Sequence, residues 1–389
     1  MMAGPQDLEE ALAAAHTVAD SILARDAAEV DREARWPERG MRALQEAGLG
    51  GLVVPKSLGG VGQGLQGLLQ VCEELGARCP STSLAFGMHC VGSAVIAARA
   101  TPEQEGALLA PIAMGEHLTT LALSEPGTGA HFYFPQARIR ANDHGTYVIN
   151  GQKSFVTNGG YADSYVVSAM AEPEDTGTEK FSCVVVPSDA PGIGWGEDWN
   201  GMGMRGNSSR GMTLKQVPVP ASNLLGSEGD QLWYVFNVIA PYFLMAMAGT
   251  YLGLARSAFD DATSHIKKRS YAHSGSSLSE APVVQHRVGE LFGLLERTRS
   301  FANNAAERAD QGDTNALAAV LTSKAEVADC AVRMVNECMT LVGGAGYENQ
   351  GLMHRRLRDV RAAHVMSPTT DLLRLWTGRT LLDQPLLAE

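Results

Sequence analysis

The spacing of apolar residues changes twice along this chain, and the order of the changes limits the folds it can adopt. Apolar residues recur at helical spacing up to about residue 117, short strand-like runs follow to about 226, and helical spacing then returns. Blocks in this order do not form the alternating βαβ units of a parallel α/β domain. We therefore expect an α+β protein with an N-terminal helical domain (1–117), a middle antiparallel β domain (118–226) and a C-terminal four-helix bundle (227–389).

The same pattern predicts the individual elements. It favours helices over residues 7–25, 37–47, 65–75 and 82–100, a helix start at 101–104, and strands over 118–123, 137–150, 164–171, 181–187 and 211–219. Helices are expected again over residues 231–269, 282–310, 314–342 and 369–382. The Gly-rich stretch 55–64 and the segment 273–279 are expected to be loops.

Two local patterns suggest other folds and are set aside. Residues 201–206 (GMGMRG) match the GxGxxG letters of a dinucleotide-binding motif, but that motif needs a strand before it and a helix after it. A turn and then a strand follow here, so we expect a glycine-rich β-turn. Residues 238–255 carry no charge, at the lower limit of length for a membrane span. Pro241, Gly249 and Gly253 interrupt this run, so we expect a buried core helix.

Charge and cysteine content narrow the class of protein. The 389 residues include 43 acidic and 31 basic side chains, a net charge of −12, which argues against nucleic acid or an anionic membrane as a partner. The six cysteines show no CxxC spacing, so neither a disulfide framework nor a zinc site is indicated, and no metal is expected. The first residues lack the basic start and apolar run of a signal peptide, which favours a reducing, cytoplasmic compartment.

Three groups of segments follow one another in an order typical of one flavoprotein family. The first is 121–129 (LALSEPGTG) with 150–160 (NGQKSFVTNGG), the second is 201–206 with 217–220 (VPVP) and 223–226 (NLLG), and the third is 343–347 (GGAGY) with 358–361 (RDVR). Together they resemble the acyl-CoA dehydrogenase family over nearly the whole chain. The resemblance implies the three domains above, FAD between the last two, and a homotetramer or dimer whose subunits contribute to each other's flavin sites.

The resemblance also implies FAD-binding residues. Ser124 and Thr157 match positions whose hydroxyls hydrogen-bond the isoalloxazine, and such donors favour the reduced flavin. Gly127 and Gly129 would let the backbone approach the pyrophosphate. The other matching positions pack against the ring or hold the rest of FAD, some of them across subunits: Leu121, Leu123, Ala130, Phe155, Arg269, Gln285, Thr340, Gly343, Gly344 and Thr369.

The family's catalytic position is not acidic in this chain. Most members remove an α-proton with a Glu that follows the Arg-Asp-x-Arg stretch, and the matching residue here is Ser367, whose hydroxyl is not a useful base near neutral pH. A minority branch keeps its Glu on the first bundle helix, where this chain has Phe243. Asp371 is the nearest carboxylate and a candidate relocated base, although an acid at this place is typical of a helix N-terminus.

The chain also departs from the family at other contacts. Ala130 and His131 replace the usual Ser/Thr-Asp pair, and Pro241 and Leu244 stand where an Asp and an Arg would hold an acyl-CoA. Thr340 replaces a common FAD-contacting Gln. Flavin binding is still expected despite these departures, whereas ordinary β-oxidation is not.

Loss of CO2 from a β-keto acid would supply an enolate without a protein base. Family relatives in natural-product pathways, the epoxyketone synthases, combine decarboxylation, desaturation and epoxidation. We therefore expect a FAD-dependent oxidoreductase of specialised metabolism that oxidises an acyl or β-keto acid substrate without the Glu base, as a dehydrogenase or monooxygenase. Candidate substrate contacts are His89, His131, Tyr242, Phe243, Arg361 and Ser367.

Two other interpretations stay open. One is an α,β-dehydrogenase of acyl-CoA or acyl carrier protein with a relocated base, which would explain the lost CoA contacts. The other is a non-catalytic scaffold that binds flavin or an acyl group. The sequence leaves the electron acceptor open between O2 and an electron-transfer flavoprotein.

Overall fold

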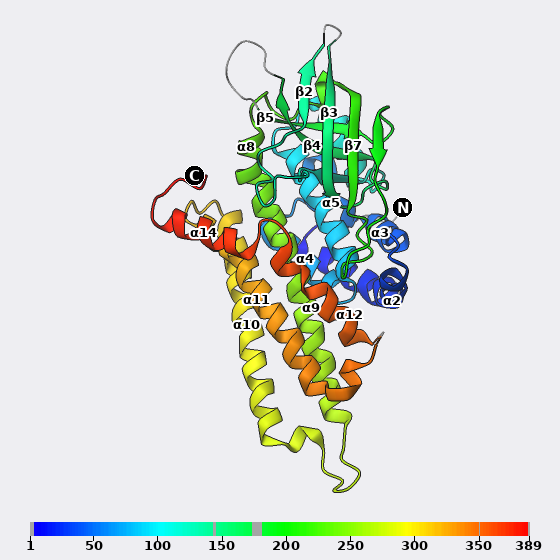
Figure 1. Cartoon of the computed structure of the whole chain (residues 1–389), viewed down its shortest axis with the longest axis vertical. Helices are drawn as coiled ribbons and strands as arrows, with labels where there is room; N and C mark the ends of the chain where they lie inside the picture. The colour runs from blue at the N-terminus through cyan, green and yellow to red at the C-terminus, as the bar shows by residue number, and fades with distance from the viewer. Residues whose placement is uncertain (1–3, 143–144, 173–180, 350, 388–389) are drawn as a thin grey trace.

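The computed structural model describes residues 4–142, 145–172, 181–349 and 351–387, which form a helical domain, a β-sheet domain and a long helical bundle (Figure 1). The sheet lies at one end of the elongated molecule and the bundle extends to the other. This arrangement confirms the expected α+β class. All six cysteines are free and buried.

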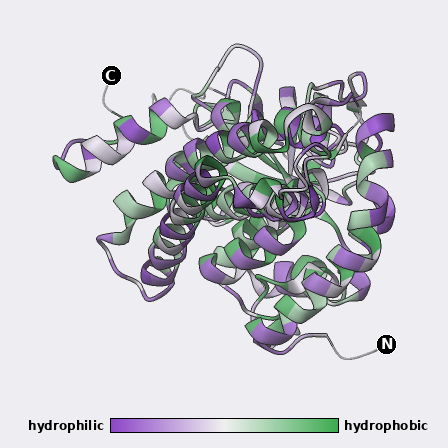
Figure 2. Cartoon of the chain, turned by 90° about the horizontal axis from the view of Figure 1, so that it is seen from below, coloured by the Kyte–Doolittle hydropathy of each residue, from purple (hydrophilic) through white to green (hydrophobic). Residues whose placement is uncertain are grey.

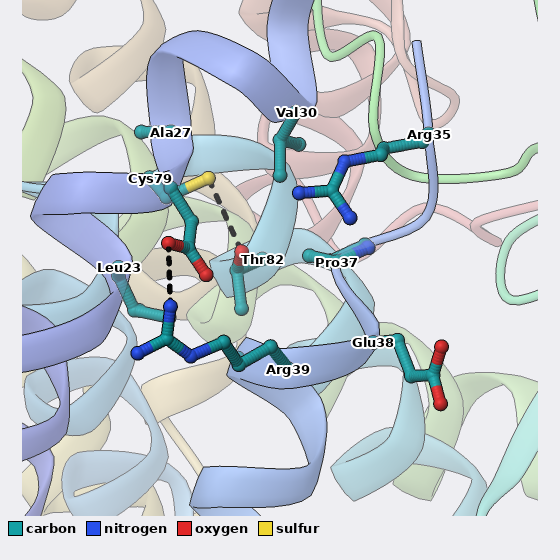
Figure 3. Close-up of a pocket in the computed structure, with 11 residues that line it drawn as sticks. Leu23, Ala27, Val30, Arg35, Pro37, Glu38, Arg39, Cys79 and Thr82 are labelled. Carbon is teal, nitrogen blue, oxygen red and sulfur yellow. Dashed lines mark hydrogen bonds and ion pairs between the residues drawn. The ribbon is translucent and has the colours of Figure 1, made fainter. Parts of the chain in front are cut away.

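The N-terminal domain is built around two buried helices, α4 (Leu65–Gly76) and α5 (Pro80–Ala98). Thr101 and Gln104 form a capping box at the start of α6 (Pro102–Gln104), as expected for a helix start. A cavity of about 10 Å³ beside α2, α3 and α5 has room for one water molecule at most, and is too small for a ligand site (Figure 3). The surrounding helices are α1 (Leu8–Val18), α2 (Ala24–Glu33), α3 (Glu38–Glu46) and α7 (Ala110–Ala113), with a π-helical turn (Ala19–Leu23) joining α1 to α2.

The middle domain is a seven-stranded sheet with mixed strand directions. Its strands are β1 (Thr119–Ala122), β2 (Arg138–Ala141), β3 (Thr146–Val156), β4 (Ser164–Ala171), β5 (Phe181–Pro187), β6 (Ile193–Trp195) and β7 (Arg210–Pro220). Strand β4 pairs in parallel with β1 and β2 and antiparallel with β5, while β2–β3, β3–β7 and β7–β6 are antiparallel. The antiparallel expectation therefore holds except where β1 and β2 run beside β4.

One predicted strand is a hairpin. The alternating stretch 137–150 contains all of β2 and the start of β3, with Ile139 opposite Ile149. Asn142 closes the turn, since its Oδ1 accepts from Thr146 N at 3.1 Å, and Gly145 has a φ of +69°. A period-2 pattern continues through such a turn, so it cannot reveal the change of direction.

The C-terminal domain is a bundle of long helices. Helix α8 (Gln231–Tyr234) continues through a π-helical turn (Val235–Ile239) into α9 (Ala240–Lys268). Helix α9 packs against α10 (Pro282–Asp310) and α11 (Ala316–Val342), and α14 (Thr370–Leu381) packs against α11. The short helices α12 (Leu352–Val360) and α13 (Ala362–Val365) were not predicted. Viewed from below, many helices carry purple polar and green apolar residues on the same turns, the pattern of amphipathic helices (Figure 2).

Among the residues that the structure describes, two helices are long and apolar enough to cross a membrane by length and composition. These are α5 and the continuous helix Gln231–Lys268, and 89% and 83% of their apolar windows are buried inside the protein. Residues 238–255 thus form the buried core helix that the sequence predicts.

Glycines set the contact between α4 and α9. A Cβ atom on Gly249 would collide with the Leu69 carbonyl oxygen, and one on Gly253 would collide with that of Glu73. On the facing helix, Gly76 approaches the Thr250 carbonyl oxygen in the same way. The two backbones therefore touch, which fixes the bundle against the N-terminal domain.

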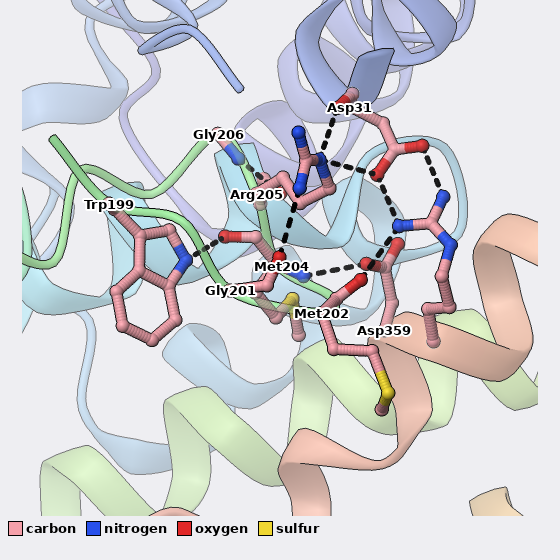
Figure 4. A network of polar contacts seen from close by, with 10 residues as sticks. Asp31, Trp199, Gly201, Met202, Met204, Arg205, Gly206 and Asp359 are labelled. Carbon is pink, nitrogen blue, oxygen red and sulfur yellow. Dashed lines mark hydrogen bonds and ion pairs between the residues drawn. The ribbon is translucent and has the colours of Figure 1, made fainter. Parts of the chain in front are cut away.

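A polar network ties the loop between β6 and β7 to both helical domains (Figure 4). Met204 N donates to Asp359 Oδ1 at 2.7 Å, Arg205 Nε donates to the Asp31 carbonyl at 2.7 Å, and Arg358 pairs with the Asp31 carboxylate. A Cβ on Gly203 would collide with the carbonyl oxygen of Arg358. The GxGxxG match is therefore a loop whose glycine permits close packing, as the sequence predicts.

We expect Gly253→Ala to destabilise the protein by roughly 1–3 kcal/mol, because the added methyl overlaps backbone atoms that cannot move aside. Gly289→Ala is the matched control on α10, where a Cβ meets nothing within 4 Å, and it should stabilise the helix by about 0.5–1 kcal/mol. Urea unfolding of both variants measures the difference. Equal effects would show that the α4–α9 contact can relax.

Asp359 should make stability depend on pH. Burial raises its pKa to about 6, above the ordinary value of about 3.9 that it regains on unfolding. Between these values the folded protein binds more protons, so this residue lowers stability as pH rises. Asp359→Asn keeps an acceptor for Met204 N, and its stability relative to wild type should improve by roughly 3 kcal/mol from pH 4 to pH 7. Parallel pH profiles would contradict this, and the exposed Asp189→Asn serves as control.

Candidate active site

A cavity of about 810 Å³ lies where the three domains meet, and its size is that of a cofactor and substrate site. Its wall is mostly apolar. Helix α5 contributes Leu84 and Met88, the sheet domain contributes residues from 121–132, 154–157 and 199–209, and the bundle contributes Ile239, Ala240, Phe243 and residues of 358–369.

A buried ion pair holds one side of this wall. Lys153 Nζ lies 2.6 Å from Glu125 Oε1, and the two side chains are 0% and 2% exposed. Glu125 also accepts from the backbone N–H groups of Gln136 and Ala137, at 2.6 and 3.1 Å. Burial lowers the pKa of Lys153, and the adjacent carboxylate opposes that shift. The pair therefore fixes the segment from 124 to 137 against the sheet, with its charges and hydrogen bonds satisfied.

Many of the predicted FAD contacts meet at the cavity. Thr157 Oγ1 and Ser209 Oγ share a hydrogen bond of 3.0 Å, and a Cβ on Gly127 or Gly129, both with positive φ, would meet no other atom within 4 Å. Phe155 is 66% exposed and packs edge-on against Trp199. The predicted FAD residues on the wall are Leu121, Leu123, Ser124, Gly129, Ala130, Phe155, Thr157 and Thr369.

The two positions where the family resemblance leads one to expect a catalytic acid line the cavity, and neither holds an acid. Ser367 and Phe243 lie on the wall, and the buried Ser367 Oγ has no hydrogen-bond partner among the described residues. Asp371 is exposed in the first turn of α14 and does not line the cavity. Its position fits a helix N-terminal acid, which does not support a relocated base. Tyr242 also lies off the wall.

A buried lysine lies directly behind Ser367. Lys324 on α11 is 0% exposed, and its Nζ donates to the carbonyl oxygens of Met366 and Pro368 at 2.8 and 3.0 Å. Burial lowers the pKa of Lys324 to about 7. No role was predicted for Lys324 from the sequence, although its register with Val320 and Val327 on an apolar helix face was a usable signal.

The two histidines proposed as substrate contacts lie elsewhere. The Thr119 N–H donates to His89 Nδ1 at 3.1 Å and His89 Nε2 lies 2.9 Å from the Gly50 carbonyl, so this buried ring joins backbone segments. Burial lowers the pKa of His89 to about 4. His131 is exposed and bonds Tyr133 at 2.7 Å. Neither lines the cavity, whereas Arg361 does.

A second group of predicted FAD residues gathers at the far end of the bundle, away from the cavity of the same chain (Figure 1). Arg269 Nη1 donates to the Val342 carbonyl at 3.5 Å, next to Gly343, and Gln285 Nε2 donates to the Ser279 carbonyl at 3.0 Å. Thr340 and Gly344 lie at the same end, where α11 finishes.

Comparison with known proteins identifies the family. Models of the N-terminal, middle and C-terminal domains of acyl-CoA dehydrogenase match residues 5–116, 120–217 and 242–382. Cyclohex-1-ene-1-carbonyl-CoA dehydrogenase of Geobacter metallireducens is 32% identical over 94% of this chain and 95% of its own.

Solved structures agree with this comparison. Butyryl-CoA dehydrogenase of Megasphaera elsdenii superposes with a TM-score of 0.90 at 25% identity, covering 96% of this chain and 98% of that one. The prolyl acyl carrier protein oxidase AnaB shares the fold, with a TM-score of 0.86 at 22% identity over 96% and 98% of the two chains. The chain belongs to the acyl-CoA dehydrogenase family and is a FAD-dependent oxidoreductase of that type.

Proposed function

We propose that this enzyme oxidises an acyl substrate, a β-keto acid, by a decarboxylative route that needs no side-chain base, in the manner of the epoxyketone synthases. One observation carries the proposal. The only carboxylate among the described residues on the cavity wall is Glu125, and Lys153 and two backbone N–H groups occupy it. An acid held in this way is not free to accept a proton from a substrate.

The residues on the wall fit a flavin. Ser124 and Thr157 would hydrogen-bond the isoalloxazine, Leu121, Leu123 and Phe155 would pack against it, and the open backbone at Gly127 and Gly129 suits a pyrophosphate. Bound FAD supplies the two-electron acceptor, from which O2 or an electron-transfer flavoprotein takes the electrons onward.

The substrate chemistry balances without a base. The bond between the α-carbon and the carboxylate breaks, CO2 leaves, and the electron pair stays on the α-carbon as an enolate. When the α-carbon carries an alkyl group, loss of a hydride from the first carbon of that group, which bound FAD would accept, gives an α,β-unsaturated ketone, so the substrate loses CO2 and two electrons in all. The unpartnered Ser367 hydroxyl can donate a hydrogen bond to the enolate oxygen.

We further propose that the second group of predicted FAD residues, at the far end of the bundle, completes the flavin site of a second subunit in a dimer or tetramer. This group consists of Arg269, Gln285, Thr340, Gly343 and Gly344. Arg269, Thr340 and Gly343 do not line the cavity of their own chain. Large exposed apolar side chains on the bundle, among them Val283, Phe292 and Tyr347, fit a covered surface.

The proposed reaction predicts that FAD-loaded protein converts a 2-alkyl-3-oxo acid to CO2 and an unsaturated ketone, or to the epoxide of that ketone when O2 supplies the oxygen atom, and leaves saturated acyl-CoAs unoxidised. Asp371→Asn should keep the wild-type rate, because Asp371 lies off the wall. Ser367→Glu is the matched variant, and it should gain oxidation of saturated acyl thioesters. Gas release and product mass measure both.

Other outcomes would redirect the assignment. Rapid oxidation of saturated acyl-CoAs, abolished by Asp371→Ala, would refute the base-free route in favour of a relocated base. Turnover of an acyl carrier protein thioester alone would identify a carrier-bound dehydrogenase.

The shared flavin site predicts that Arg269→Ala weakens flavin binding about tenfold, although Arg269 lies off its own cavity. Lys268→Ala, one residue away, should have no effect. Visible flavin absorbance after desalting and the mass from light scattering test this. Unchanged flavin retention, or a monomer, would contradict it.

A further inference from the structure

The charges of the side chains on the cavity wall do not sum to zero once the ion pairs are taken into account. Glu125 is paired with Lys153, and Arg358 is paired with Asp31. Arg361 is the remaining charged residue on the wall, and it has no carboxylate partner within the described part of the chain. The part of the cavity wall that directly follows α12 in the chain, at Arg361, therefore carries a net positive charge.

Two side chains outside the wall orient Arg361. Its Nη1 lies 3.3 Å from His364 Nδ1, and His364 Nε2 lies 3.0 Å from Asp329 Oδ1. A guanidinium only donates, so Nδ1 accepts, and Nε2 carries the proton that is donated to Asp329. Asp329 is also paired with Arg374, which holds it in place. Arg361 itself is exposed, and its other N–H groups face no carboxylate that the structure describes.

Ser367 and Lys324 add to the same wall. The buried Ser367 Oγ can donate to a ligand in the cavity, since it has no partner among the described residues. Lys324 donates to the carbonyls on both sides of Ser367 and is bound to no carboxylate in the described residues. At pH values below about 7, the pKa that burial gives Lys324, its ammonium also contributes positive potential behind the hydroxyl, where water does not screen it.

We propose that Arg361 and Ser367 form an anion-binding subsite of this cavity, positioned by His364 and Asp329, which receives a carboxylate of the acyl substrate. The identity of the ligand rests on the proposed function. A β-keto acid carries a free carboxylate, and a saturated acyl thioester does not, so the subsite distinguishes these two substrate classes. Charge-assisted hydrogen bonds from a guanidinium are strong enough to do so. The phosphate of a phosphopantetheine arm is the other source of such an anion.

Calorimetric titration of the FAD-loaded protein with octanoate and octanamide tests the subsite, because the two probes match in length and differ in charge. The wild type should bind octanoate about tenfold more tightly. Arg361→Gln should abolish this preference and leave octanamide binding unchanged. His364→Leu should reduce the ratio of octanoate affinity to octanamide affinity. A general loss of stability would weaken the binding of both probes and leave this ratio unchanged. Arg333→Gln removes a cation of α11 that pairs with Glu290 and lies off the wall, and it should keep the wild-type ratio.

Equal binding of the two probes by wild type, or a preference that survives Arg361→Gln, would overturn the subsite. Phosphopantetheine and pantetheine form a second pair of probes. A preference that depends on Arg361 in this pair alone would overturn the carboxylate assignment and give the anion to the carrier arm. Neither pair requires turnover. A charge preference in a protein that does not convert β-keto acids would support the subsite and refute the proposed reaction.

Discussion

The ion pair between Lys153 and Glu125 organises the site, because it places a loop wall and a sheet wall on one cavity. Two opposite charges are stable at this depth only when every polar atom around them is satisfied. Here backbone N–H groups of the loop and the Ser168 carbonyl meet that requirement. The same contacts underlie the proposed base-free reaction, since they occupy the only carboxylate among the described residues of the wall. The Lys153–Glu125 pair thus both joins the two walls of the cavity and leaves the wall without a free carboxylate among the described residues.

Around this pair, the domains are held by close backbone approach and by buried polar contacts. Gly249 and Gly253 bring the central bundle helix against α4, and Gly203 brings the β6–β7 loop against α12. Asp359 and Arg358 then join that loop to the bundle and to the N-terminal domain. A cavity at such a junction has walls from three units, so its shape depends on how these units are fixed to one another.

Sequence patterns predicted what depends on local spacing. The order of helices and strands, the start of α6 and the buried helix at 238–255 follow from periodicity and capping. The reversal of direction between β2 and β3 was missed because alternation alone does not mark it. Site residues in family motifs, such as Ser124 and Thr157, were found at the cavity, but Lys324 was not, since its role depends on a turn 42 residues away. His89 was wrongly expected to contact the substrate, because the sequence around a single histidine does not show which groups it will bond in the fold.

The continuous helix from Gln231 to Lys268 has a further consequence. One part of it forms cavity wall at Ile239, Ala240 and Phe243, and its end leads to Arg269. Its 38 residues make a rod of about 57 Å. In an oligomer with shared flavin sites, the length of this helix would set the distance between the cavity of its own chain and the flavin site to which Arg269 contributes. Inserting a single residue would advance one end by about 1.5 Å and rotate it by about 100°. The length of this helix is then under a constraint from assembly geometry, separate from the packing along its sides.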